Sequence, residues 1–459
     1  MRILQVVHGF PPESRAGVEL YTYGLAKELS KRHEVHVVYP SATPRTKGYS
    51  ANKYDSDILN LVEHVIRKDN RQLSFLGLKA PVNLKHTYID NSIYREFEIL
   101  LDETAPDIVN FQHLINLSAS LIELVKERRI PAVLTLHDFW FICPRINLLK
   151  SDYSVCKGPD IQSGNCFKCY STARAESKAE AWVKYGIPRG ISKALSKAYG
   201  LTVTTVTNSG DFKQRQERMK PLLLMVDKLI APSRFLRNIF IQYGIPGDRI
   251  IYSSNGYDLS AFEGFKKKEK DRLVFGFAGG VAKHKGVHVL VEAFNKVENE
   301  NVELIIYGTY DPKSNYFKEL QSMIRNDNIK FMGRYTDVRE PYSNVDVLVV
   351  PSICYENCPL VIQEAFISKT PVIASNVGAL PEFIQHDKTG LLFQVGNPQD
   401  LYEKIKVIIE NPRLIEAFKS NIKSVKTIQE QAIEIEEIYR SVLTERSADK
   451  SISDAAIQR

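Results

Sequence analysis

The sequence predicts an α/β fold in which two Rossmann-like domains turn parallel sheets toward a central cleft. Short apolar runs typical of buried strands alternate with helical segments through most of the 459 residues. The alternation forms two series, and the charged stretch at residues 262–272 separates them. Because a chain of this length usually forms more than one domain, we expect domains at 1–258 and 259–430, followed by a helix and polar tail at 431–459.

The first series contains a clear amphipathic helix at residues 18–33, with Leu20, Leu25 and Leu29 on one side. Ligands of parallel sheets lie beyond the carboxyl ends of the strands, and those ends here carry histidine, aspartate and serine. Strands are predicted at residues 2–8, 34–40, 106–113, 131–138 and 228–233.

The second series predicts another parallel sheet, whose clearest helix covers residues 286–297. The chain from about residue 401 is expected to be helical, and its last 13 residues, SADKSISDAAIQR, to be frayed. Strands are predicted at residues 273–280, 302–308, 329–334, 345–352 and 371–375.

Composition and charge narrow the class of protein. The net charge of +7 arises from 61 basic residues mixed among 54 acidic ones, so it does not by itself demand a nucleic-acid partner. The N-terminal apolar run has five residues, far too few for a secretory signal. No apolar stretch approaches the roughly 18 residues of a membrane span. We therefore expect a cytoplasmic protein.

Two carboxylates eight positions apart, Glu356 and Glu364, flank a proline in the stretch PSICYENCPLVIQEAF. Pro359 suits the first position of a helix. The backbone amides of Leu360 and Val361 would then lack partners within the helix and form an anion site. A phosphate at this helix start and hydroxyls bound by the two carboxylates would match a nucleotide-sugar.

These features resemble the family 4 glycosyltransferases, a group of retaining, nucleotide-sugar-dependent enzymes with the GT-B fold. The resemblance covers about residues 2–410 and includes the Glu-x7-Glu signature, which Glu356 and Glu364 match. The other matching segments, in chain order, are HGFPPESRAGVE, TLHDFWFICPR, APSRFL, SSNGYD, GVAKHKGVHVLVEAF and EAFISKTPVIASNVGALPEFIQHDKTGLLF.

The resemblance implies a role for each matching residue. It assigns Glu364 to the ribose hydroxyls of the donor and Glu356 to hydroxyls of the transferred sugar. Lys285 would neutralise the diphosphate, and His137 would face the sugar near its reacting carbon. Gly17 lies in the first strand-to-helix loop, where a residue without Cβ lets the backbone approach a ligand. The implied catalytic residues are His137, Glu356 and Lys285.

One departure from the family concerns the diphosphate. The family usually has a Gly-Arg pair where this chain has Gly279 and Gly280. Either Lys283 replaces the missing cation, or the amides at the helix start carry more of the charge. The resemblance also places the base near Arg334, in the GRY loop, where backbone groups usually hold it.

Two further residues, His113 and Asp138, are expected on the acceptor side. Asp138 either orients His137 or caps the following turn. The only Asp-x-Asp pair, Asp55 and Asp57, is far in sequence from the donor motifs, and we interpret it as solvated. The resemblance therefore implies metal-independent, front-face transfer, in which the leaving diphosphate helps to deprotonate the acceptor.

Four cysteines lie in an expected insertion at about residues 143–220. Cys143, Cys156, Cys166 and Cys169 have the spacing C-x12-C-x9-C-x2-C, and four thiolates would complete a tetrahedral structural zinc site. The alternative is a set of reduced thiols in an acceptor-side loop. No cofactor is expected for catalysis itself.

The stretch between Ala181 and Gly210 contains basic and aromatic residues but no acidic residue. It either touches anionic lipid headgroups at the inner face of a membrane or is a solvated basic helix face. The residues on which this expectation rests are Trp182, Lys184, Tyr185, Arg189, Lys193 and Lys197.

The function expected from the resemblance is retaining transfer of a hexose-type sugar from a nucleoside diphosphate to a glycan or lipid-linked glycan. Surface polysaccharide or lipopolysaccharide assembly is the expected setting. Two alternatives stay open. A nucleotide-sugar epimerase can have the same fold, and a non-catalytic carbohydrate-binding protein could have kept it.

Overall fold

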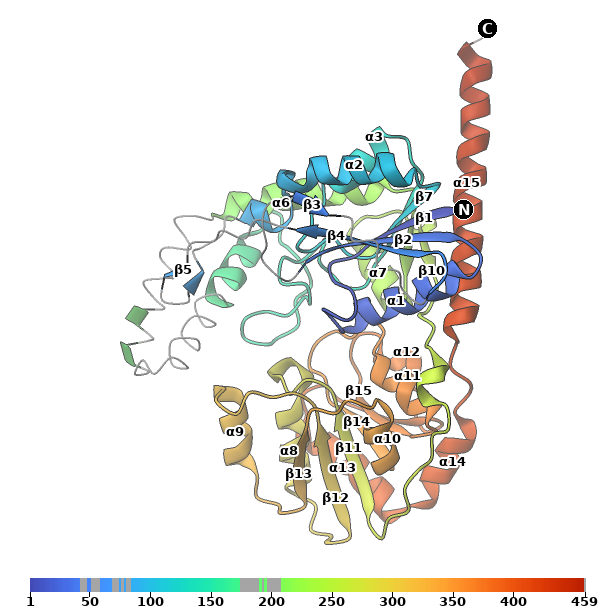
Figure 1. Cartoon of the computed structure of the whole chain (residues 1–459). Helices are drawn as coiled ribbons and strands as arrows, with labels where there is room; N and C mark the ends of the chain where they lie inside the picture. Colours follow the sequence, from blue (N-terminus) through green and yellow to red (C-terminus); the bar gives the residue numbers. More distant parts are fainter. Residues whose placement is uncertain are drawn as a thin grey trace.

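The computed structural model contains two α/β domains, each built around its own sheet (Figure 1). The predicted fold class, with two parallel sheets and a cleft between them, is confirmed. In the part of the chain that the structure describes, no helix is long and apolar enough to cross a bilayer. The described residues are 1–41, 48–50, 58–67, 74–75, 78–79, 84–173, 190–191, 194–195 and 208–457.

The first sheet has the strand order β10-β9-β8-β7-β1-β2-β4-β3 over the described residues. All neighbouring strands are parallel except β3 and β4, and a separate antiparallel pair joins β5 (Ser74–Phe75) and β6 (Leu78–Lys79). The strands of the first sheet are β1 (Arg2–Val6), β2 (Glu34–Pro40), β3 (Gly48–Ser50), β4 (Leu61–Arg67), β7 (Ile108–Phe111), β8 (Ala132–Thr135), β9 (Lys228–Ala231) and β10 (Ile250–Tyr252).

Helices cover both faces of this sheet because successive strand residues point to opposite sides. Ile3 packs with the first helix, whereas Leu4 packs with helices of the other face. The helices of this half are α1 (Gly17–Ser30), α2 (Tyr94–Thr104), α3 (Leu121–Glu127), α6 (Ser209–Met225) and α7 (Arg234–Gln242), with short 3-10 turns at Leu84–Thr87, Asn91–Ile93 and Gly247–Arg249.

The second sheet is parallel throughout, in the order β13-β12-β11-β14-β15-β16. All six residues of β12 are buried, as expected of a strand covered on both faces. The strands are β11 (Leu273–Ala278), β12 (Val302–Tyr307), β13 (Ile329–Gly333), β14 (Val347–Val350), β15 (Val372–Ser375) and β16 (Gly390–Phe393).

The second domain also has helices on both faces of its sheet. Side chains of α8 and α13 pack in one apolar core, and those of α11 and α12 pack in another. The helices are α8 (Val287–Phe294), α9 (Asn315–Met323), α10 (Arg339–Asn344), α11 (Leu360–Ile367), α12 (Leu380–Phe383), α13 (Pro398–Glu410) and α14 (Arg413–Asn421), with 3-10 turns at Leu259–Phe262 and Lys283–Lys285.

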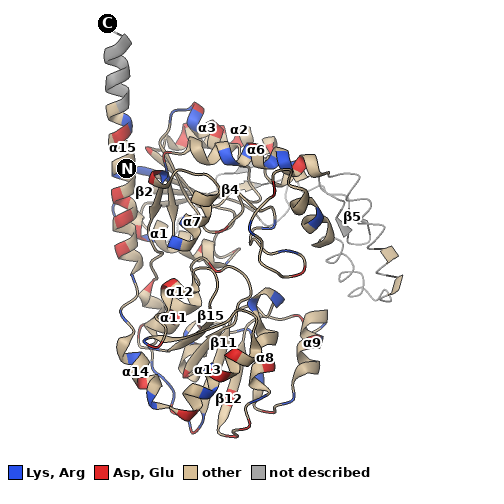
Figure 2. Cartoon of the chain, turned by 180° about the vertical axis from the view of Figure 1, so that it is seen from behind, with Lys and Arg blue, Asp and Glu red and all other residues tan. Residues whose placement is uncertain are grey.

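The last helix, α15 (Ile428–Ile457), returns to the first domain and lies along α1 (Figure 1). Its apolar side chains join the core beneath α1, and the hydroxyl of Tyr439 accepts a 2.7 Å hydrogen bond from the Asn110 side chain. Acidic positions gather along α15 (Figure 2), and Glu436 pairs with Arg32 at 2.9 Å. The polar end was expected to fray, but the helix runs to Ile457.

Both sheets place their strand-order reversal at the same cleft. β1 lies between β2 and β7, and β11 lies between β12 and β14. The loops beyond the carboxyl ends diverge at such points and leave room for a ligand. The chain segments that follow β1, β8, β11 and β14 consequently face one another between the domains (Figure 1).

Candidate active site

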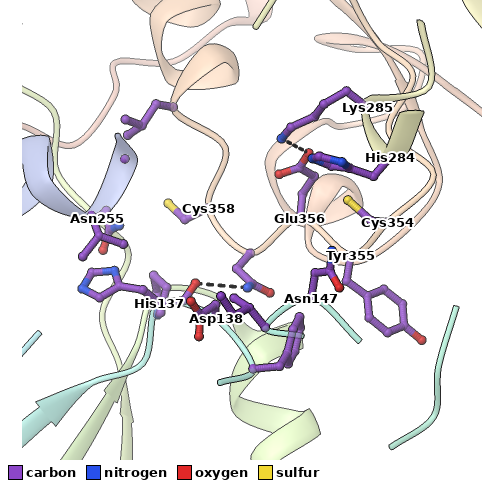
Figure 3. Close-up of a pocket in the computed structure, with 17 residues that line it drawn as sticks. His137, Asp138, Asn147, Asn255, His284, Lys285, Cys354, Tyr355, Glu356 and Cys358 are labelled. Carbon is purple, nitrogen blue, oxygen red and sulfur yellow. Dashed lines mark hydrogen bonds and ion pairs between the residues drawn. The ribbon is translucent and has the colours of Figure 1, made fainter. Parts of the chain in front are cut away.

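A cavity of about 260 Å³ lies between the two domains, at the carboxyl ends of both sheets. Figure 3 shows Lys285 and Glu356 on one side of it, with His137 and Asp138 opposite. The structure therefore brings together residues from sequence segments more than 200 positions apart. Of the predicted site residues, those that line this cavity are Gly17, His137, Asp138, Lys285, Glu356 and Leu360.

Two helices begin at the cavity. α1 begins at Gly17 and α11 begins at Leu360, and no side chain caps either start. A Cβ on Gly17 would lie 3.8 Å from Cδ1 of Leu360, which is ordinary contact. The N-terminal amides of a helix attract anions, so this end of the cavity suits a phosphate. Pro359 was expected as the first helical residue, but it is extended and precedes the helix.

Lys285 and Glu356 form an ion pair in the cavity. The Lys285 ammonium donates to Oε1 of Glu356 at 2.7 Å, and the Ser352 hydroxyl donates to the same oxygen at 2.7 Å. Burial alone would raise the pKa of Glu356, but the Lys285 charge and both hydrogen bonds hold this pKa below its usual value. Burial likewise opposes the charge on Lys285, and Glu356 raises the pKa of Lys285 above its usual value.

The loop that carries Glu356 is fixed by a glycine. Gly378 has φ +62°, and a Cβ there would lie 2.8 Å from the backbone N and O of Glu356. The next amide, of Ala379, donates to the Glu356 carbonyl at 2.8 Å. Only glycine combines this left-handed backbone with so close an approach, so the NVGAL stretch sets the position of the carboxylate.

Glu364, the second carboxylate of the motif, is buried behind the cavity lining. The Tyr342 hydroxyl donates to its Oε2 at 2.5 Å and the Tyr257 hydroxyl to its Oε1 at 3.0 Å. Burial raises the pKa of Glu364, and the two hydroxyls oppose that shift. Neither tyrosine was predicted as a site residue, although Tyr257 belongs to the SSNGYD segment.

His137 lies at the end of β8, where its ring meets the edge of Tyr21. Gln112 donates through Nε2 to Gln5, which leaves its Oε1 to accept from Nε2 of His137 at 2.9 Å. Nδ1 of His137 is then the acceptor nitrogen. Burial, followed by the charge of His113, lowers the pKa of His137 to about 3, so its imidazole is neutral at physiological pH.

Asp138 orients His113 and not His137. The amide of Ile115 donates to Nδ1 of His113, so Nε2 of His113 carries the proton that it donates to Asp138 at 2.9 Å. The other oxygen of Asp138 accepts from the Trp140 amide at 2.8 Å and caps the turn. Two roles were predicted for Asp138. The structure shows that it caps the turn, as one prediction had it, but the histidine that it orients is His113 and not His137.

A further pair, His8 and Glu19, lies beside these groups. His8 follows β1, with Nε2 3.4 Å from Oε1 of Glu19, and the Ser14 hydroxyl donates to that oxygen at 2.6 Å. The His8 ring packs against His113. Burial and the charge of His113 lower the pKa of His8 to about 4. The position of His8 after the first strand was the available sequence signal.

Other predicted donor residues do not line the cavity. The Lys283 ammonium lies over the Tyr153 ring, 5.2 Å from its centroid, and Arg334 is exposed beyond β13. Val361 packs into the apolar core beneath α11. Gly279 and Gly280 follow β11 outside the cavity, and a Cβ on Gly280 would meet no atom within 4 Å. Roles for these residues stay predictions.

Contacts between the domains surround the cavity. The side-chain amide of Asn357 donates to the carbonyl of His137 at 3.1 Å. The Glu382 carboxylate, on α12, accepts from the backbone amides of Arg234, at 2.8 Å, and Phe235, at the start of α7. A carboxylate at a helix N-terminus is favourable. The structure thus has the two domains in direct polar contact.

The remaining sequence predictions concern the cysteine group, the Asp-x-Asp pair and the basic stretch. The four cysteines of the predicted zinc site lie together around a second, smaller cavity. Asp55 and Asp57 lie outside the described residues, as do the six residues named above for the stretch that was expected either to touch lipid headgroups or to be a solvated helix face.

Comparison with models of known protein families identifies the family of this chain. A model described as Glycosyltransferase Family 4 matches residues 15–155, and one described as Glycosyl transferases group 1 matches residues 261–425. The two matches follow one another along the chain and together cover about two thirds of it. The chain therefore belongs to the family 4 glycosyltransferases, and its two domains form a GT-B fold.

Particular relatives share part of the sequence. The capsular polysaccharide biosynthesis glycosyltransferase CapM of Staphylococcus aureus is 27% identical over 42% of this chain and 54% of its own length. A lipopolysaccharide 1,2-N-acetylglucosaminetransferase of Salmonella typhimurium is also 27% identical, over 36% of this chain and 48% of its own. The chain thus spans about half the length of these curated relatives.

Solved structures share the whole fold. Anabaena HepE, in complex with UDP and glucose, superposes with a TM-score of 0.61 over 96% of this chain and 100% of its own, at 18% identity. Sucrose-phosphate synthase of Thermosynechococcus elongatus gives a TM-score of 0.66 over 97% and 99%, at 17% identity.

Proposed function

We propose that this protein transfers a sugar from a nucleoside diphosphate sugar to a hydroxyl of a glycan or lipid-linked glycan, with retention of anomeric configuration. The observation that supports this most is the cavity between the domains. It joins the Lys285–Glu356 pair and the start of α11 on one side to His137 on the other. The names of CapM and of the Salmonella transferase point to surface polysaccharide or lipopolysaccharide assembly as the setting.

The donor is assigned to the second domain. Its diphosphate would lie at the start of α11, where the amides and Lys285 supply positive charge. Glu356 would accept hydrogen bonds from hydroxyls of the transferred sugar. Glu364 would bind the ribose through the lone pairs that Tyr257 and Tyr342 leave open. HepE, whose structure holds UDP and glucose, supports a donor of this kind.

The proposed reaction exchanges one bond at the anomeric carbon for another. The bond from this carbon to the phosphate oxygen breaks, and a bond to the acceptor oxygen forms on the same face. The acceptor proton passes to the departing phosphate oxygen. Glu356 and Glu364 are both assigned to hydroxyls of the donor, so neither carboxylate is left to act as the nucleophile of a double displacement. Positioning and stabilisation of the leaving diphosphate therefore carry the catalysis, without a divalent metal.

The test is a thermal-shift screen against nucleoside diphosphates and their sugars, because the sequence does not identify the base. A ligand at about 100 times its Kd should add about 2.7 kcal/mol to the free energy of unfolding. The best donor is then incubated with and without glycan acceptors. Release of nucleoside diphosphate with a new glycosidic bond supports the proposal. An epimerised donor formed without acceptor, or no stabilisation by any nucleotide, contradicts it.

A further inference from the structure

Four cysteine thiols line a second cavity, of about 40 Å³, beside the first domain's core. All four are free. Cys166 and Cys169 lie three positions apart on the helical segment 164–173, so they share one face. Cys143 and Cys156 approach from the preceding loop. This cavity is separate from the proposed donor site.

The loop has a geometry that suits a metal knuckle. Leu149 and Val155 form an antiparallel bridge, and the Cys156 amide donates to the Leu148 carbonyl at 2.7 Å. These bonds fold residues 148–156 back on themselves and carry Cys156 to the cavity. Beyond this fold, the Gly158 amide donates to Sγ of Cys156 at 3.4 Å. Hydrogen bonds of this kind orient and stabilise a metal-bound thiolate.

Two arginines face this cysteine group. Nη1 of Arg145 lies 3.2 Å from Sγ of Cys169. Arg215 is 1% exposed, and its guanidinium donates to the Trp140 carbonyl and lies against the rings of Tyr88 and Trp140. Its Nε and Nη1 have no hydrogen-bond partner. A buried guanidinium without an anion is costly, and the sulfur atoms are nearby groups that can become anionic.

All four cysteines line the same small cavity, together with Arg145. Four thiolates around one Zn²⁺ carry a net charge of −2. Arg145 and Arg215 together supply the matching charge of +2.

We propose that Cys143, Cys156, Cys166 and Cys169 bind one structural Zn²⁺ as thiolates. The four ligands are the complete set of a closed tetrahedral site, and binding releases their protons to solvent. Among the residues that the structure describes, no three metal-binding side chains already have coordinating geometry. Binding of the ion therefore requires the four sulfur atoms to move closer together within the cavity that they line.

The ion would fix one wall of the active site. Ile146 and Asn147, which line the donor cavity, lie between the first two cysteines in the sequence. Phe139, which lines it as well, donates from its amide to the Ile146 carbonyl at 3.0 Å. The role of the zinc is consequently to hold this loop in place, and the metal takes no part in sugar transfer.

Metal analysis of the untagged full chain, purified without chelator, tests the proposal. We expect one zinc per chain in the wild type and loss of zinc from the double variant Cys166→Ser, Cys169→Ser. Cys354→Ser, which removes a buried thiol outside the group, should keep its zinc. Protein in which cobalt replaces zinc should show the absorption of tetrahedral thiolate coordination. Absence of transition metal, or a disulfide between cysteines of this group, would overturn the proposal.

The arginine contribution has its own test, which needs no cysteine variant to fold. Zinc release to a chromogenic chelator is timed for the wild type, Arg215→Lys and Arg215→Met. The lysine variant keeps the charge and should release zinc at close to the wild-type rate. The methionine variant keeps the bulk without the charge and should release it at least tenfold faster. Equal rates in all three proteins would contradict the charge argument.

Discussion

The Lys285 ammonium lies 2.7 Å from Oε1 of Glu356 inside the cavity between the domains. Each residue stabilises the charged form of the other in a place where burial opposes both charges. A donor diphosphate would compete with Glu356 for the same ammonium. Glu356 would then be free to accept bonds from the sugar, so the pair couples diphosphate binding to sugar binding.

Lys285→Met should weaken binding of the nucleoside diphosphate by roughly 10- to 150-fold, since one charge-assisted hydrogen bond contributes about 1.5–3 kcal/mol. The variant also leaves Glu356 buried with only the Ser352 hydroxyl. The lowered pKa of Glu356 stabilises the fold at pH above its ordinary value, and this contribution disappears as the pH falls through the folded-state pKa. At pH 7 the variant should therefore be about 1–3 kcal/mol less stable.

Isothermal titration and urea unfolding measure the two effects of Lys285→Met. The matched control is Lys283→Met, because the Lys283 ammonium lies over Tyr153 outside the cavity. We expect this control to bind the nucleotide within about threefold of the wild type, since it loses no bond of the size above. A larger loss in the control would show that Lys283 replaces the arginine that the family usually has.

Glu364→Gln should lower donor affinity by an order of magnitude or more, because it removes charge-assisted bonds of about 1.5–3 kcal/mol to the ribose. The side chain keeps its shape between Tyr257 and Tyr342. Titration with nucleoside diphosphate measures the effect, and Glu340→Gln, at an exposed position of α10, is the control. Wild-type affinity in Glu364→Gln would show that the ribose assignment is wrong.

The stability should fall when the pH is lowered from 7 to 5, because buried histidines are held neutral. Burial, followed by His36, lowers the pKa of His64 to about 4. Such a group binds a proton below about pH 6.5 in the unfolded chain but only near pH 4 in the folded protein, so acid favours unfolding. Between pH 7 and pH 5, each histidine of this kind should lower the free energy of unfolding by about 2 kcal/mol.

Urea unfolding at both pH values checks this expectation. His64→Gln, which changes a residue of the sheet away from the cavity, should reduce the pH-dependent loss by about 2 kcal/mol. The comparison uses the difference between the two pH values, so any general destabilisation by the substitution cancels. An unchanged pH dependence would mean that His64 is protonated in the fold.

Domain closure should depend on Glu382, which bonds to the first amides of α7 in the other domain. Glu382→Ala should increase the radius of gyration of the ligand-free protein. Saturating nucleoside diphosphate should then produce a larger compaction than in the wild type, since the ligand bridges both domains. Small-angle scattering measures both quantities. Glu403→Ala, at an exposed position of α13, is the control, and equal radii in all three proteins would contradict this role.

The parallel sheets were predictable because their strands are continuous apolar runs that both faces bury. The sequence missed strands that break this rule. β4 includes Glu63 and His64, and β10 has only three residues. The sequence also shows that α15 has an apolar face. It does not show which of the two domains that face packs against. That choice depends on contacts of α15 with α1, some 400 residues earlier.

The candidate site was predictable where a backbone feature fixes a side chain. Strand ends, a helix start and the loop before it brought His137, Leu360 and Glu356 to one cavity. Side-chain partners were not predictable. His137 and Asp138 are neighbours in the sequence, and neighbours at a strand end point to opposite sides, so His137 meets Gln112 and Asp138 meets His113.

The last prediction concerns His137 and the stereochemistry. Its neutral ring donates from Nε2 to Gln112 and keeps Nδ1 as an acceptor beside the cavity. A lone pair in that position favours the positive charge that develops on the sugar during transfer. His137→Ala should therefore lower kcat by at least tenfold and change donor affinity much less, because the lost contact is strongest in the transition state.

The anomeric configuration of the product distinguishes retention from inversion. If the leaving diphosphate assists attack from the face that it departs, an α-linked donor must give an α-linked product. While the structural zinc stays bound, EDTA should leave the rate unchanged, because Lys285 and the start of α11 meet the diphosphate charge. The anomeric proton coupling in the NMR spectrum of the isolated product measures the outcome directly. A β-linked product would mean inversion, and the roles proposed for His137, Lys285 and Glu356 would be wrong together.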